Sequence, residues 1–139
     1  MKAGAGEAGG NNLGPFVEKY LVPAGLRPPQ PWCAAFVSWC VHKAARKLKR
    51  NAPIPYLAGA RAILNRARRL DLLTHDPQPG DLVVWSRGNP AGPMGHIGIV
   101  AGREDGAIDT IEGNKTSKVE RFSYRLGSMP RLLGFVRLP

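Results

Sequence analysis

The stretch from Gln30 to Cys40 reads QPWCAAFVSWC, and the rest of the chain is arranged around it. The prolines before and within its start keep the incoming backbone extended, and proline is tolerated at the first position of a helix but not inside one. The apolar run that follows Pro31 contains no helix breaker. We therefore predict a buried helix over about Trp32 to Arg50, with Cys33 in its first turn.

Cys33 is the candidate nucleophile of this helix. A thiol in a first turn lies among unpaired backbone N–H groups at the positive end of the helix dipole. Such positions lower the pKa of a cysteine from about 8.5 to roughly 3.5–7.5. The alternative is a small core residue, which is the usual role of a lone cysteine in an apolar run. Catalysis by Cys33 therefore requires a base that reaches it from elsewhere in the fold.

Cys40 fits the alternative role of a core residue. Seven positions after Cys33 the helix has returned to nearly the same face, and the two Cα atoms are then roughly 10 Å apart, beyond the ~7 Å limit for a disulfide. These are the two cysteines of the chain. The sequence therefore predicts no disulfide framework, and the fold does not need an oxidising compartment.

The composition is that of a single globular domain. A chain of 139 residues with 43% hydrophobic and 22% charged residues is long enough to bury a core, so we expect one domain over 1–139 with a flexible start over 1–12. No stretch is long enough to span a bilayer, and the start has no apolar signal-peptide core. We expect a monomer that is made in the cytoplasm without a signal peptide and does not insert stably into membranes.

The net charge of +10 predicts attraction to polyanions, such as nucleic acid, lipopolysaccharide, teichoic acid or an anionic membrane surface. A nucleic-acid-binding module is the alternative from a different functional class, and it should interleave basic residues with stacking aromatic residues. Aromatic residues make up 7% of the chain, and Trp32, Phe36 and Trp39 fall within the predicted buried helix. We therefore expect no nucleic-acid partner.

The rest of the chain reads as helices followed by strands. A short helix is predicted over 15–21, and three- and four-residue apolar spacing predicts an amphipathic helix over 57–71. After a turn at 76–80 the pattern changes to strands, over 81–85, 96–102, 107–114, 118–124 and 132–138. The short spacings favour an antiparallel meander. The sequence thus predicts an α+β fold, with N-terminal helices packed on a C-terminal antiparallel sheet of about five strands.

His96 and Glu112 are the candidates for the base and its orienting acid. The loop over 103–105, with a glycine on either side, is predicted to connect two antiparallel strands. If the loop has three or five residues, His96 lies directly opposite Glu112 with Cβ atoms about 5 Å apart, within reach of a carboxylate–imidazole contact. A four-residue loop would break this pairing. Gly98 and Gly113 would leave room beside the two side chains.

These residues can be given roles in amide cleavage. Cys33 attacks as a thiolate, and His96 shares its proton and later donates it to the leaving amine. Glu112 fixes the tautomer and orientation of the imidazole, and Asn114, on the same face as Glu112, is a second orienting or hydrogen-bonding group. His42 cannot be the base, because nine positions after Cys33 it lies on the opposite side of the helix.

A zinc site is disfavoured by the same helical geometry. Zinc ligands typically occur in close pairs along the sequence, and this chain has none. The four candidate ligands cannot all converge on one ion: Cys33, Cys40, His42 and His96. We expect neither a metal nor a cofactor.

Four segments carry a resemblance to a known family: PWCAAFVSWC (31–40), PGDLVVW (79–85), GHIGIVAG (95–102) and IEGN (111–114). In them the chain resembles the CHAP group (cysteine, histidine-dependent amidohydrolase/peptidase) of papain-like bacterial and phage hydrolases. The resemblance implies a papain-like fold and catalysis by Cys33, His96, Glu112 and Asn114.

The resemblance also implies a substrate and a place of action. The substrate would be peptidoglycan at the bacterial cell wall, cut either at the N-acetylmuramoyl–L-alanine bond or at an amide bond within its peptides. Because the chain is strongly positive, anionic cell-surface polymers are further candidate ligands. A compact phage endolysin and a secreted antibacterial amidase effector both fit, and the basicity with the missing signal sequence favours the endolysin. An acyltransferase or deamidase that uses the same dyad is a further alternative, because fold and dyad do not fix the acceptor.

Overall fold

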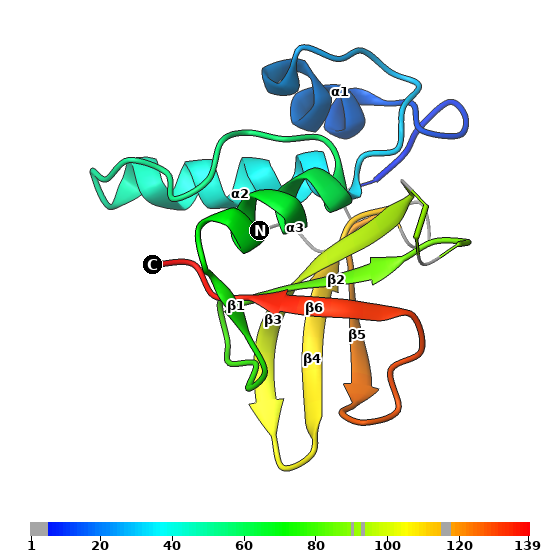
Figure 1. Cartoon of the computed structure of the whole chain (residues 1–139). Coiled ribbons are helices and arrows are strands. Elements are labelled where there is room, and N and C mark those ends of the chain that lie inside the picture. The colour runs from blue at the N-terminus through cyan, green and yellow to red at the C-terminus, as the bar shows by residue number, and fades with distance from the viewer. Residues whose placement is uncertain (1–5, 90, 93, 115–117) are drawn as a thin grey trace.

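The computed structural model describes residues 6–89, 91–92, 94–114 and 118–139, with the helices first and most of the sheet after them (Figure 1). The helical part contains α1 (Pro15–Leu21), the short 3-10 helix η1 (Val22–Ala24), α2 (Cys33–Lys47) and α3 (Ala60–Arg69). The strands are β1 (Leu73–Thr74), β2 (Leu82–Ser86), β3 (Gly95–Glu104), β4 (Ala107–Glu112), β5 (Glu120–Arg125) and β6 (Leu132–Val136). The predicted α+β fold class is confirmed.

The strands form one antiparallel sheet in the order β1-β6-β2-β3-β4-β5. The predicted meander is correct from β2 to β5 and wrong for β6, which returns to pair with β2. The short strand β1, which was not predicted, pairs with β6. Burial explains the position of β6: Phe135 and Val136 are buried on opposite faces of the sheet, whereas β5 alternates between half-buried and exposed residues as an edge strand does. Beyond β5, these two apolar side chains would lie at an exposed edge.

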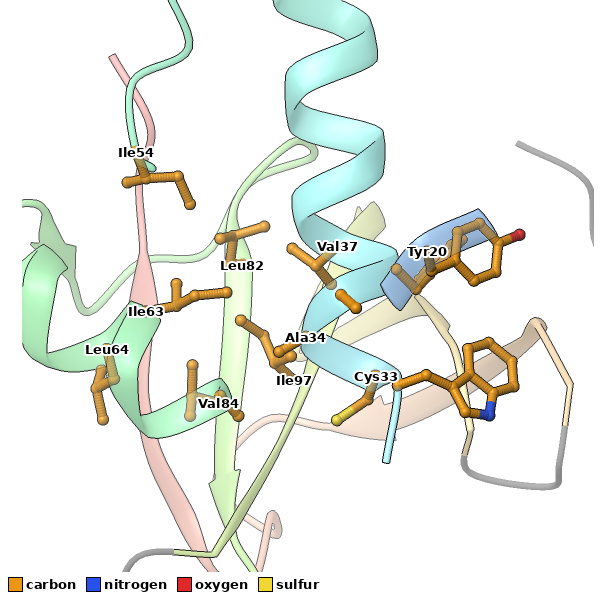
Figure 2. Packing of buried hydrophobic residues seen from close by; sticks show 14 of the residues in the cluster. Tyr20, Cys33, Ala34, Val37, Ile54, Ile63, Leu64, Leu82, Val84 and Ile97 are labelled. Carbon is orange, nitrogen blue, oxygen red and sulfur yellow. The ribbon is translucent and has the colours of Figure 1, made fainter. Parts of the chain in front are cut away.

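The main core lies between the sheet and the helices α2 and α3, while α1 packs on α2 at the side away from the sheet (Figure 1). Figure 2 shows Ala34 and Val37 of α2 close to Ile97 of β3, with Ile63 of α3 above Val84 of β2. All five side chains are fully buried. None of the described helices has the length and apolarity needed to cross a bilayer.

The helix α3 is shorter than the predicted 57–71. Gly59 stands at its N-cap with an extended backbone, so Leu57 lies before the helix although it packs against the core. At the other end Asp71 has a φ of 57°, a left-handed conformation that stops the helix after Leu70. The predicted helix was too long at both ends, because apolar residues just outside a helix can pack on the same core as the helix and continue its apolar spacing.

The opposite face of the sheet carries a second apolar cluster. Its buried members are Val83, Trp85, Val100, Ile108 and Phe135. Alternation along β2 places Val83 and Trp85 in this cluster and Leu82 and Val84 in the main core. Both faces of β2 are therefore buried, which explains its continuous apolar sequence.

Candidate active site

Cys33 is the first residue of α2, as predicted. Trp32 stands at the N-cap and provides no side-chain cap, so the backbone N–H groups of the first turn keep the free donor capacity of a helix start. The side chain of Cys33 is turned toward the sheet near Ile97 (Figure 2), and the residue is 4% exposed. The thiol is thus a buried group at the positive end of a helix.

Gly113 allows the end of β4 to approach this helix start. A Cβ atom at Gly113 would lie 2.9 Å from Cζ3 of Trp32 and 3.1 Å from Cβ of Phe36, closer than side chains normally pack. The indole N–H of Trp32 in turn donates to Oε1 of Glu7 at 3.0 Å. Glu7 therefore contacts the start of α2 through Trp32. Gly113 leaves room for Trp32 and Phe36, not for His96 and Glu112 as predicted.

His96 is the second residue of β3, and it stands opposite Trp85 of β2. The two rings stack with centroids 5.6 Å apart and an interplanar angle of 28°. His96 is 6% exposed, and its Nε2 lies 2.7 Å from Oε1 of Glu112. Stacking and this hydrogen bond together fix the plane and the rotation of the imidazole.

Glu112 is fully buried at the end of β4 and is surrounded by donors. Its Oε1 faces His96, while its Oε2 accepts hydrogen bonds from the hydroxyl of Tyr124, at 2.7 Å, and from the hydroxyl of Thr110. Burial alone would raise the pKa of Glu112, but the bonds from His96, Thr110 and Tyr124 outweigh it and lower the pKa. The group is therefore a buried carboxylate that keeps its negative charge.

The register that brings His96 and Glu112 together differs from the predicted one. Gly98, not His96, stands opposite Glu112. The strands β3 and β4 are joined by the two residues Asp105 and Gly106, and a register shift follows between Val100 and Gly102. The prediction of a three- or five-residue loop is wrong, because Asp-Gly is itself a two-residue hairpin signal.

The contact forms because Gly98 leaves the intervening position empty. His96 lies two residues from Gly98 on the same face of β3, so it is a diagonal neighbour of Glu112. The Glu112 side chain passes over Gly98 to reach the imidazole: a Cβ atom at Gly98 would lie 2.6 Å from Cγ of Glu112. The predicted pair of side chains therefore meets, across a glycine.

Cys33 and His96 form the hydrogen-bonded pair at the centre of the candidate site. Because Nε2 of His96 is engaged by Glu112, Nδ1, which Arg87 also contacts, is the nitrogen that the thiol can use. Burial raises the pKa of Cys33, but a hydrogen bond to His96, the charges of His96 and Arg87 and a backbone hydrogen bond at Ile97 outweigh it and lower the pKa. Burial lowers the pKa of His96, whereas its hydrogen bonds with Cys33 and Glu112 outweigh this and raise it. Both shifts favour a thiolate–imidazolium pair.

Asn114 stands two residues beyond Glu112, after the end of β4. Its φ of 64° places it in the left-handed region just after β4, and its backbone N–H donates to the carbonyl of Lys118 at 3.2 Å. Within the described part of the chain, its side chain makes no hydrogen bond to Cys33 or His96. The structure thus brings together Cys33, His96 and Glu112, and leaves a role for Asn114 as a prediction.

Several residues around the site were not predicted. Thr110 lies two positions before Glu112 on the same face of β4, so strand periodicity could have identified it. Tyr124 reaches Glu112 from β5, which depends on a strand register that the sequence does not show. Arg87 directly follows β2, and its Nη2 lies 3.1 Å from Nδ1 of His96. No local signal distinguishes it from other surface arginines.

The other candidate ligands lie elsewhere. Nε2 of His42 lies 2.9 Å from the carbonyl of Ile54, and its ring packs edge-on against Tyr56. Cys40 is half-buried, and burial raises the pKa of its thiol to about 11. Nowhere in the described ranges do three His, Cys, Asp or Glu side chains cluster to hold a metal ion.

Comparison with known proteins gives one family match and several structural matches. The model of the CHAP domain family matches residues 26–114, which include Cys33, His96, Glu112 and Asn114. The fold is similar to the crystal structure of Ly7917, with 17% identity, a TM-score of 0.59, and coverage of 87% of this chain and 58% of that one. No curated protein matches the sequence.

Two further solved structures show the same likeness. Ly7917 in complex with the hydrolyzing product of MDP has 16% identity and a TM-score of 0.56, over 87% of this chain and 59% of that one. The wild-type endolysin LysIME-EF1 has 19% identity and a TM-score of 0.51, over 78% and 53%. The chain spans somewhat more than half the length of these proteins, and at such identities the likeness is one of fold.

Proposed function

The chain belongs to the CHAP domain family, and on that basis we propose that it is a peptidoglycan hydrolase that cleaves an amide bond of the cell wall with Cys33 as nucleophile. The observation that carries the proposal is the convergence of Cys33, His96 and Glu112 from a helix and two strands. A family match alone does not fix the chemistry, whereas a buried thiol beside an oriented imidazole is an arrangement for nucleophilic catalysis.

The first half of the proposed reaction forms an acyl-enzyme. The Cys33 thiolate attacks the carbonyl carbon of the substrate amide, and the negative charge moves to the carbonyl oxygen. Backbone N–H groups at the start of α2 can stabilise this oxyanion. The tetrahedral intermediate collapses as Nδ1–H of the His96 imidazolium protonates the leaving amine, and a thioester remains on Cys33.

The second half releases the acid. Neutral His96 takes a proton from water, and the hydroxide attacks the thioester carbonyl. Collapse expels the Cys33 thiolate and frees a carboxylic acid, and His96 again carries its proton. Glu112 stabilises the imidazolium throughout without taking the proton, since its hydrogen bonds hold it as a carboxylate.

The bond cleaved would be the N-acetylmuramoyl–L-alanine amide or an amide within the peptide, and the biological setting would be a phage endolysin. The structural neighbour LysIME-EF1 is named an endolysin, which supports this setting. A secreted antibacterial amidase effector of the same fold is the alternative.

The charge distribution supports action at an anionic cell wall. No acidic residue occurs between Glu18 and Asp71, and this segment, which forms most of the helical layer, contains 11 of the 20 lysines and arginines. A layer with a single sign of charge attracts anionic polymers over a distance of about a Debye length, roughly 8–10 Å at physiological salt. We propose that it holds the enzyme near anionic wall polymers.

Mass spectrometry of the fragments released from purified peptidoglycan tests this proposal. Cleavage by an amidase leaves peptides that begin with L-alanine and glycans with free muramic acid carboxyl groups. Cleavage by an endopeptidase instead creates new N-termini within the peptides. Fragments with only glycosidic bonds broken, or no fragments at all, would contradict the proposal.

A further inference from the structure

Arg87 is a cation beside Cys33 and His96, and no step of the reaction described above involves it. It directly follows β2, is half-buried, and places Nη2 at 3.1 Å from Nδ1 of His96. Its charge also acts on the Cys33 thiol. Cys33 and His96 are 4% and 6% exposed, so Arg87 is the most exposed of the three residues.

The backbone that carries Arg87 is held in place from two sides. The N–H of Arg87 donates to the carbonyl of Met94 at 3.1 Å. Arg61 of α3 donates from Nε to the same carbonyl at 3.0 Å and from Nη2 to the carbonyl of Asn89 at 3.3 Å. The guanidinium of Arg87 therefore projects toward His96 from an anchored hairpin.

No carboxylate neutralises Arg87 within the described ranges. The ion pairs there use Arg103, Lys118, Arg137 and His96 as their cationic partners. A guanidinium has five donors and no acceptor, and its fork matches the two oxygens of a carboxylate. The one described side-chain contact of Arg87 uses a single nitrogen of this fork.

The contact between Arg87 and His96 depends on which nitrogen of the imidazole carries the proton. Because a guanidinium can only donate, Nδ1 must be unprotonated when Arg87 is bound to it, and the ring proton is then on Nε2, facing Glu112. In the thiolate–imidazolium pair Nδ1 carries a proton, so the guanidinium cannot bond to the ring and its donors are available to another acceptor. A carboxylate could then take the place of His96 as the acceptor for this guanidinium.

We propose that Arg87 binds a free carboxylate of the peptide next to the scissile amide. The inference rests on the proposed function, since the peptides of peptidoglycan carry free carboxylates. Charge-assisted bidentate hydrogen bonds between arginine and carboxylate supply both affinity and orientation. Arg87 would then select acidic peptides and orient them against the reactive atoms.

Alkylation of Cys33 by iodoacetate and by iodoacetamide tests the anion site without any cell wall. In both reagents Sγ attacks the CH₂ carbon and iodide leaves, so they differ in carrying a carboxylate or a neutral amide. We expect Arg87→Met to lower the iodoacetate-to-iodoacetamide rate ratio about tenfold or more, a loss of about 1.4 kcal/mol of selectivity. Arg69→Met, which removes the same charge from the exposed end of α3, should leave the ratio unchanged. An unchanged ratio in Arg87→Met would overturn the inference.

A pair of peptide substrates then tests the specificity. One carries a free carboxylate next to the scissile amide, and the other is amidated at that carboxylate. The wild-type protein should cleave the acidic peptide with a kcat/KM about tenfold higher or more, and Arg87→Met should cleave both alike. A preference that survives in Arg87→Met would contradict the role of Arg87, because a structural defect lowers both rates together.

The two assays separate this inference from the proposed function. If the rate ratio responds to Arg87 but the wild-type protein releases nothing from peptidoglycan, the proposed function fails and the anion site stands. If the wild-type protein cleaves peptidoglycan but neither the rate ratio nor the peptide preference depends on Arg87, the function stands and the inference fails.

Discussion

His96 and Glu112 contact each other across a position where the sheet carries no side chain. Their Nε2 and Oε1 atoms are 2.7 Å apart, yet the residue opposite Glu112 is Gly98. The contact is therefore diagonal, and it exists because the Glu112 side chain occupies the space above the glycine. The orientation of the proposed base thus depends on a residue that takes no part in the chemistry.

The variant Gly98→Ala should lose both activity and stability. Its Cβ would lie 2.6 Å from Cγ of Glu112, so the carboxylate must move away from His96. We expect a destabilisation of about 1–3 kcal/mol, typical of overpacking in a core, and a drop in kcat/KM of about tenfold or more. Chemical denaturation and peptidoglycan digestion measure the two effects.

The matched control is Gly102→Ala on the same strand. There the nearest atom to an added Cβ is Oδ2 of Asp109 at 3.4 Å, an ordinary contact. We expect activity close to that of the parent protein. Full activity in Gly98→Ala would mean that Glu112 does not need its present path to the imidazole.

The sequence predicted the nucleophile end of the site well because its signals are local. Pro31 and the apolar run after it set the start of α2 at Cys33, and the short helix α1 has the predicted bounds of 15–21. The position of β6 could not be predicted, since its pairing with β2 depends on how two apolar faces are covered. Strand order is a property of the whole sheet.

The predicted pairing of β3 with β4 was wrong, but it still placed His96 and Glu112 on the same face of the sheet, for a physical reason. The observed pairing is displaced by two residues from the predicted one, so that Gly98 replaces His96 opposite Glu112. Side chains alternate with period two along a strand, so an even displacement keeps His96 and Glu112 on the same face. A displacement of one residue would have turned His96 away from the carboxylate. Arg87 and Tyr124 have no motif of their own, and their roles emerge from the three-dimensional arrangement alone.

Glu112→Gln should weaken catalysis and move the pH profile. The amide keeps the size of the side chain but removes the negative charge that helps to raise the pKa of His96. With that pKa lowered, the imidazolium is lost at a lower pH, so the alkaline limb of activity should move to lower pH. We expect a loss of about 10²-fold or more in kcat/KM at neutral pH.

A pH–rate profile of both proteins on the same substrate checks this outcome. Tyr124→Phe provides a milder companion, since it removes one hydrogen bond to Oε2 and keeps the charge of Glu112. It should lower activity by only a few fold, in line with a single hydrogen bond worth about 1 kcal/mol. An alkaline limb that stays in place in Glu112→Gln would show that Glu112 does not set the ionisation of His96.

The two cysteines should react with iodoacetamide in very different pH ranges. The pKa of Cys33 is lowered by His96 and Arg87 against the effect of burial, whereas burial raises the pKa of Cys40 to about 11. Because the thiolate is the reactive species, Cys33 should be modified at neutral pH while Cys40 is not. Peptide mapping by mass spectrometry after brief labelling at a series of pH values measures both sites in one sample. Equal labelling of Cys33 and Cys40 at neutral pH would count against an activated thiol.

A comparison of Cys33→Ala with Cys40→Ala on purified peptidoglycan tests most directly whether Cys33 is the nucleophile of a cell-wall hydrolase. Both variants remove one sulfur from the same helix α2, and circular dichroism and thermal unfolding would check that each is folded. We expect Cys33→Ala to release no fragments above background, while Cys40→Ala retains activity. Undiminished release of fragments by folded Cys33→Ala would contradict this role of Cys33.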